Sequence, residues 1–149
     1  PSEVEVLADE TANPIFVAAD LLSQAEHGVD SQAILITTSV ELQQAVKVEV
    51  ERQLALLPRK EIAEKSLANS KLIVVDSMTE AIELTNAYAP EHLIIETEDY
   101  LSVAERIVNA GSVFLGSLTP ESAGDYASCR QTAMPKHTAV SALTALSAR

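Results

Sequence analysis

Two polar side chains, Gln24 and His27, end an otherwise apolar helix pattern in the stretch DLLSQAEHG at residues 20–28. Three residues apart on a helix, they would lie on one face and could share a ligand such as a metal ion. Histidine in a last helical turn followed by glycine is also an ordinary helix stop signal. Glutamine is an uncommon metal ligand, so this pair by itself leaves both interpretations open.

A second candidate pair, Glu91 and His92, follows Pro90 at a predicted helix-to-strand junction. A glutamate beside a histidine can perform general acid–base chemistry, because both groups titrate near neutrality when their surroundings tune them. A third candidate, Asp125, follows Gly124 in a loop beyond the last predicted strand. Taken alone, Glu91 and His92 are also typical of a polar loop. Taken alone, Asp125 is also typical of a turn.

Short β-branched runs alternate with helix patterns along the chain. The runs predict strands that are buried on both faces, and they comprise residues 4–8, 33–38, 71–76, 92–97 and 112–116. The helix patterns comprise residues 13–27, 39–57, 59–68, 78–89 and 99–111. Asn13 is a candidate cap of the first pattern with Pro14 at its first helical position, and Ser39 opens the second. The third follows Pro58, and the last ends at Gly111.

This alternation predicts an α/β fold, a mainly parallel five-stranded sheet with helices on both faces, as in an incomplete Rossmann-like domain. In such sheets ligands bind beyond the carboxyl ends of the strands. Gly28, Pro90 and Gly124 lie in or near connections between the predicted elements. We therefore expect the candidate chemistry to gather at the carboxyl edge of the sheet.

Composition narrows the classes of function. The 149 residues indicate one domain, and a hydrophobic share of 47% excludes a disordered chain. A net charge of −12 argues against sequence-independent binding to nucleic acid or to an anionic membrane. The single cysteine, Cys129, fits a reducing compartment, so we expect a cytoplasmic protein. Only four glycines occur, and neither a G-x-G-x-x-G nor a P-loop pattern is present.

Three stretches closely resemble the histidinol dehydrogenase family: PSEVEVLADETANPIFVAADLLSQAEHGVDSQAILITTS, YAPEHLIIET and AGSVFLGSLTPESAGDYAS. The resemblance covers residues 1–128 almost without a break. It implies an enzyme that oxidises L-histidinol through histidinal to L-histidine at the end of histidine biosynthesis. The cofactors implied are two NAD and a bound zinc.

The resemblance also implies a metal set. Gln24 and His27 match the first two zinc ligands of the family, and Asp125 in the GDY motif matches a third. Zinc can hold the amine and imidazole of histidinol and orient the carbinol carbon for hydride loss. In a complete enzyme, the resemblance therefore favours the ligand interpretation of the first pair.

Two further roles follow from the resemblance. Glu91 and His92 match the catalytic pair of the family, in which the glutamate activates water for the second oxidation and the histidine takes part in proton transfer. Ser2, in the PSE motif, matches a position close to the substrate.

The last segment, residues 129–149, departs from the family. The family continues after GDYAS with glycine and a TNHxLPT motif whose histidine is catalytic, whereas this chain reads CRQTAMPKHTAVSALTALSAR. Codons can be chosen so that the neighbouring frame reads LPTDGYAKAYSGVSLDSFIRK, which resembles the missing continuation. We hypothesise a small deletion that shifted the frame, which sequencing of the coding DNA checks. We expect this tail to be poorly ordered.

The sequence thus predicts a zinc-site domain at residues 1–128 and a non-family tail. The resemblance implies that the nucleotide-binding domain, a C-terminal glutamate and a histidine zinc ligand from a partner subunit have no match here. We therefore expect weak zinc affinity and no activity from this chain alone. For the complete enzyme, the resemblance implies L-histidinol as the substrate and a homo-oligomer as the assembly. The alternative is a non-catalytic folded remnant or a self-associating interaction domain, which a large contiguous apolar patch would favour. A fragment of an otherwise normal enzyme fits the missing domain but not the altered tail.

Overall fold

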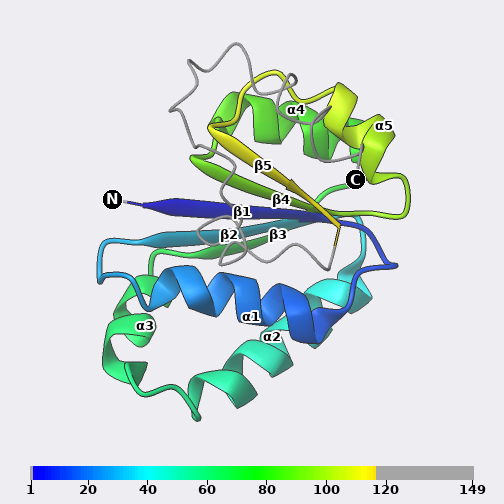
Figure 1. Ribbon diagram of the computed structural model, residues 1–149. Coiled ribbons are helices and arrows are strands. Elements are labelled where there is room, and N and C mark those ends of the chain that lie inside the picture. Colours follow the sequence, from blue (N-terminus) through cyan, green and yellow to red (C-terminus); the bar gives the residue numbers. More distant parts are fainter. Residues whose placement is uncertain (1, 117–149) are drawn as a thin grey trace, which may run out of the picture.

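A computed structural model describes residues 2–116, and Figure 1 shows them as one sheet between two layers of helices. The strands are β1 (Glu3–Ala8), β2 (Gln32–Thr37), β3 (Lys71–Val74), β4 (His92–Glu96) and β5 (Ser112–Leu115). The helices are α1 (Pro14–Ala25), α2 (Val40–Leu54), α3 (Lys60–Leu67), α4 (Met78–Tyr88) and α5 (Tyr100–Glu105).

The sheet has the order β3–β2–β1–β4–β5, and every pair of neighbouring strands is parallel. The chain runs outward from β1 to β3 on one side, then crosses back to β4 and β5 on the other. Helices α1, α2 and α3 cover one face of the sheet, and α4 and α5 cover the other (Figure 1). The predicted α/β fold with a five-stranded parallel sheet and helices on both faces is therefore confirmed.

Alternation along the strands builds two apolar layers. Val4, Val6 and Ala8 of β1 pack on one face, whereas Leu7 packs on the other. Side chains of successive residues in a strand point to opposite faces, so a strand buried on both faces is apolar throughout. Glu5 interrupts this pattern, because it is fully buried in the middle of β1.

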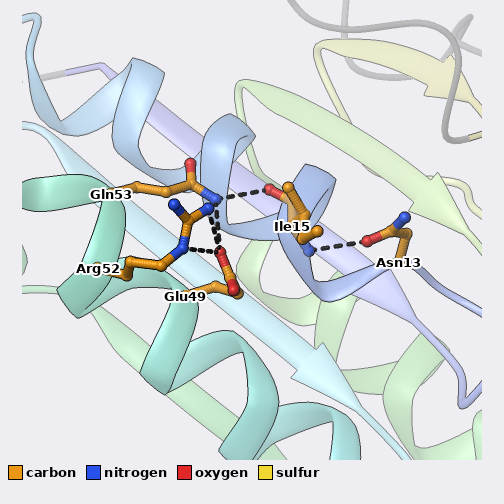
Figure 2. Close-up of polar contacts among 5 residues, drawn as sticks. All are labelled: Asn13, Ile15, Glu49, Arg52 and Gln53. Carbon is orange, nitrogen blue, oxygen red and sulfur yellow. Dashed lines mark hydrogen bonds and ion pairs between the residues drawn. The ribbon is translucent and has the colours of Figure 1, made fainter. Parts of the chain in front are cut away.

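Helix α1 begins as the sequence predicts. The Asn13 side chain accepts a hydrogen bond from the Ile15 amide at 2.9 Å, and Pro14 occupies the first turn. Gln53 of α2 reaches across and donates to the Ile15 carbonyl at 3.0 Å, while Glu49 accepts from both Gln53 and Arg52 (Figure 2). These contacts tie the start of α1 to the end of α2.

The predicted helix at residues 99–111 is too long, because α5 ends at Glu105. The Asn86 side chain on α4 accepts hydrogen bonds from the amides of Val108 at 2.8 Å and Asn109 at 3.3 Å. It also donates to the Arg106 carbonyl at 3.0 Å. These side-chain bonds satisfy backbone groups that a longer helix would have used. The segment after α5 is thereby held in an irregular path.

Within residues 2–116, no helix combines the length and apolar character needed to cross a membrane. The predicted tail at residues 129–149 lies outside the described residues.

Buried Glu5 makes the stability of the fold depend on pH. Burial raises the pKa of its carboxyl to about 7, although a hydrogen bond from the Thr85 hydroxyl at 2.5 Å acts in the opposite direction. The folded state thus holds this proton more tightly than the unfolded chain, where the ordinary value is 4.5. The resulting stability is fully present below pH 4.5, is lost as pH rises, and is gone above about 7.

Replacing Glu5 with Gln should remove this dependence. We expect E5Q to gain stability relative to the parent chain between pH 4.5 and 8, by roughly 2–3 kcal/mol. Urea unfolding at several pH values measures the difference. Glu51→Gln, at an exposed position of α2, is the matched control and should show no such trend; a pH-independent difference for E5Q would contradict the prediction.

Candidate functional site

The amino edge of the sheet brings together two motifs that lie far apart in the sequence. Ser2 directly precedes β1 and Glu91 directly precedes β4, and these two strands are neighbours in which Val4 pairs with His92. The Ser2 hydroxyl donates a hydrogen bond to the Glu91 carboxylate at 3.2 Å. The residue expected near the substrate and one member of the expected acid–base pair are therefore in contact.

His92 is half-buried at the start of β4 and is oriented by two neighbours. Its Nδ1 atom lies 3.3 Å from the Glu3 carbonyl oxygen, and its ring stacks on Phe114 of β5, with the ring centres 6.3 Å apart. A carbonyl oxygen only accepts, so this contact places the hydrogen on Nδ1. In the neutral ring, Nε2 is then the basic nitrogen.

Gly111 permits the close packing that positions Glu91. A Cβ atom at Gly111 would lie 2.5 Å from the Glu91 carbonyl oxygen, which is well inside van der Waals contact. The Gly111 amide donates to the Pro90 carbonyl at 2.9 Å, and the Ser112 amide donates to the Glu91 carbonyl at 2.8 Å. Sequence reasoning treated this glycine only as a helix stop, because nothing local in the sequence reports a contact with residue 91.

Gln24 lies in the last turn of α1 and its side chain is 0% exposed. Neither its Oε1 nor its Nε2 atom has a hydrogen-bond partner among residues 2–116. A buried amide without a partner costs free energy, and nearly all buried polar groups in proteins are paired. The amide is therefore placed for a partner that the described residues do not supply.

His27 lies just beyond α1, which ends at Ala25, so the two residues do not share one regular helix as the spacing suggested. The His27 amide donates to the Gln24 carbonyl at 3.1 Å, and its side chain is exposed. The described part of the chain contains no group of three His, Cys, Asp or Glu side chains arranged to hold a metal ion. Asp125, the third predicted ligand, lies outside the described residues.

We expected the candidate residues to gather at the carboxyl edge of the sheet, and this prediction is wrong for the candidates that the structure describes. Gly28 precedes β2 and Pro90 precedes β4, so both loops are helix-to-strand connections that enter the amino edge of the sheet. Ligand sites of parallel sheets commonly lie at the opposite edge, where strand-to-helix connections leave. Gly124 lies outside the described residues.

A cleft of about 430 Å³ does occur at the carboxyl edge, near the ends of β1 and β4. Its described lining includes four carboxylates, on Asp9, Glu10, Asp76 and Asp99, and one basic side chain, on Arg106. The nearby start of α1 has its first amide occupied by Asn13 rather than open to a ligand. Among residues 2–116, this edge therefore shows no anion-binding feature of a dinucleotide phosphate site.

Replacing Gly111 with Ala should disturb the site through the backbone of Glu91. We expect a loss of about 1–3 kcal/mol in unfolding free energy, because backbone atoms cannot yield as a flexible side chain can. The imidazole proton resonances of His92 should shift in the same variant. Gly28→Ala is the matched control, since its Cβ would meet side chains rather than backbone: the end of the exposed Asp30 side chain at 3.0 Å and the Ser31 hydroxyl oxygen at 3.8 Å. Equal effects of the two substitutions would contradict the assignment.

Comparisons with known proteins all point to one family. A family model for histidinol dehydrogenase matches residues 1–149. Histidinol dehydrogenase of Bacteroides thetaiotaomicron is 77% identical over 135 residues, which are 91% of this chain and 32% of the relative. The enzyme of Mannheimia succiniciproducens is 52% identical over 137 residues, 92% of this chain and 32% of its own.

A crystal structure of histidinol dehydrogenase from Elizabethkingia anophelis superimposes with a TM-score of 0.82 at 57% identity, covering 84% of this chain and 29% of that one. The chain thus spans about a third of the length of the relatives it matches. The match in sequence extends over the whole chain, and the match in fold over most of it. On both grounds, this chain belongs to the histidinol dehydrogenase family.

Proposed function

We propose that this chain supplies the zinc-site region of a histidinol dehydrogenase, in the last steps of histidine biosynthesis. Gln24, His27 and Asp125 would hold the metal, and Glu91 and His92 would carry the proton transfers. The observation that carries the proposal is the buried amide of Gln24, which has no partner among the described residues. It lies at the same edge of the sheet as the Ser2–Glu91 contact.

The three proposed ligands fit zinc by their chemistry. An imidazole nitrogen and carboxylate or amide oxygens suit this borderline cation. The exposed His27 side chain is accessible to a ligand from solvent. When bound, zinc would supply a Lewis acid that polarises and orients the substrate.

Proton transfer is the role of the acid–base pair. Oxidation of an alcohol removes a proton from the hydroxyl oxygen and a hydride from carbon, and the hydride passes to NAD. The Nε2 atom of His92 is suited to accept the proton, because the Glu3 carbonyl holds the hydrogen on Nδ1. The second oxidation needs water, and Glu91 would remove its proton while Ser2 holds the carboxylate in place.

NAD itself would be bound elsewhere in the complete enzyme. The described residues offer no phosphate-binding glycine loop, and the relatives are about three times as long as the matched region. We therefore propose that the isolated chain does not catalyse the reaction. L-histidinol as substrate, a homo-oligomer and a cytoplasmic location stay predictions.

The Gln24→Leu variant distinguishes a metal-binding role of the Gln24 side chain from a purely structural one. We expect the metal-free variant to be more stable than the parent by about 1–3 kcal/mol, because it removes a buried amide that lacks a partner. The same variant should lose zinc binding, measured by competition with a chromophoric chelator. A destabilised variant that still binds zinc would contradict the assignment.

Two histidine substitutions, one at the proposed site and one as a control, test the zinc site by the same measurement. His27→Ala should abolish stoichiometric zinc binding, whereas His137→Ala, in the segment that we predict to depart from the family, should leave it intact. Equal zinc binding by both variants would refute a site at His27.

NADH formation tests the catalytic part of the proposal. With L-histidinol, NAD and zinc supplied, we expect no rate above that of a heat-treated sample, since no nucleotide site is present among the described residues. A rate that Glu91→Gln abolishes would support the acid–base assignment and overturn the proposed inactivity of the isolated chain. A rate unaffected by that substitution would contradict the assignment itself.

A further inference from the structure

The cleft at the carboxyl edge lies where the order of the strands reverses. From β1 the chain continues to β2 and β3 on one side, whereas β4 and β5 lie on the other, so β1 and β4 flank the switch point. Asp9 directly follows β1, Thr97 directly follows β4, and both line this cleft of about 430 Å³. Parallel sheets commonly bind small molecules at such a point, in sites of this size. None of the candidate residues that the structure describes lines it.

A buried hydroxyl without a partner, that of Thr97, belongs to the lining of this cleft. Thr97 is 7% exposed, and its hydroxyl oxygen has no hydrogen-bond partner among residues 2–116. Leu93 and Ile95 pack on the face that α4 and α5 cover, and alternation continued past Glu96 directs Thr97 to the same face. Residues of α4 and α5 line the cleft there. Because buried hydroxyls are nearly always paired, this one is placed for a partner that the described residues do not supply.

The charge of the lining favours a cation over an anion. Four carboxylates and the guanidinium of Arg106 line the described part of the cleft. The Arg106 guanidinium donates to the Thr79 hydroxyl at 3.1 Å rather than to a carboxylate. Within residues 2–116, the ion pairs lie on α2 and α3 and not at the cleft. An anion would therefore meet net repulsion here, whereas a protonated amine would be attracted.

The carboxylates of the cleft belong to separate connections and do not form a metal site. Asp9 and Asp76 follow β1 and β3, and Asp99 caps α5. Among the described residues, no three acidic, histidine or cysteine side chains are arranged to hold a metal ion. Met78 and the buried Val103 add apolar surface to the same lining. Separate negative charges beside apolar surface match a ligand whose positive charges are joined by a short hydrocarbon chain.

We propose that this cleft binds a small aliphatic diamine in its doubly protonated form. Its two ammonium groups pair with Glu10 and Asp76, which are both exposed and therefore accessible to a ligand from solvent. Backbone amides hold the carboxylates of Asp9 and Asp99, which contribute negative charge at fixed positions. An ammonium N–H donates to the Thr97 hydroxyl oxygen and supplies its missing partner. The methylene groups contact the apolar part of the lining.

This diamine site is independent of the proposed zinc-site function. The cleft lies at the carboxyl edge of the sheet, whereas Ser2 and Glu91 lie at the amino edge. Diamine binding is measured without zinc, NAD or L-histidinol. A failure of either proposal therefore leaves the other standing.

Titration of the full chain with 1,4-diaminobutane tests the proposal, followed by two-dimensional ¹H–¹⁵N NMR at constant ionic strength. We expect saturable binding with the amide shifts concentrated at Asp76, Ser77 and Thr97. Butylamine should bind about threefold more weakly or worse, because it lacks one of the two ion pairs. 1,4-Butanediol has the same carbon chain without charges and should cause no such shifts.

Substitutions in the lining locate the site. Asp76→Asn and Glu10→Gln should each weaken diamine binding about threefold or more. Thr97→Val should weaken it as well, whereas Thr97→Ser keeps the hydroxyl and should bind as the parent does. Glu61→Gln, at an exposed position of α3 on the other face of the sheet, controls for the loss of one negative charge. Absence of saturable shifts, equal shifts with sodium chloride, or affinity unchanged by all three weakening substitutions would overturn the proposal.

Discussion

The parallel register of the sheet is the constraint on which the rest of the structure depends. Because every strand enters at the same edge, residues that directly precede β1, β4 and β5 become neighbours whatever their separation along the chain. Ser2 thereby meets Glu91, and within the neighbouring strands β4 and β5 the ring of His92 stacks on that of Phe114. The close packing of Gly111 against Glu91 then fixes the backbone at this point.

The candidate residues that the structure describes lie at the amino edge of the sheet, which the general rule for parallel sheets does not favour as a ligand site. The entry loops here carry Pro90 and Glu91, and the last turn of α1 carries Gln24. The cleft at the usual edge is lined by four carboxylates and one basic side chain, and its described lining includes no phosphate-binding loop. Among the described residues, the candidate site residues and the cleft therefore lie at opposite edges of the sheet.

Short β-branched runs were sufficient to predict the strands, and the caps at Asn13 and Ser39 were sufficient to predict helix starts, because both are local signals. The end of α5 was not predictable, since it depends on Asn86, a side chain from another helix. The role of Gly111 was missed for the same reason. Each depends on a contact between residues far apart in sequence, and no local pattern reports it.

The sheet has short borders within the described region. The outer strands β3 and β5 have four residues each, against five or six in the inner strands, and β3 begins with the exposed Lys71. An exposed strand edge is a template on which another molecule can add a strand and start an aggregate. Short borders, one of them charged, limit the length of any such intermolecular ladder. The order of the strands thus protects the apolar centre of the sheet, β1 with its two neighbours, from edge-to-edge association.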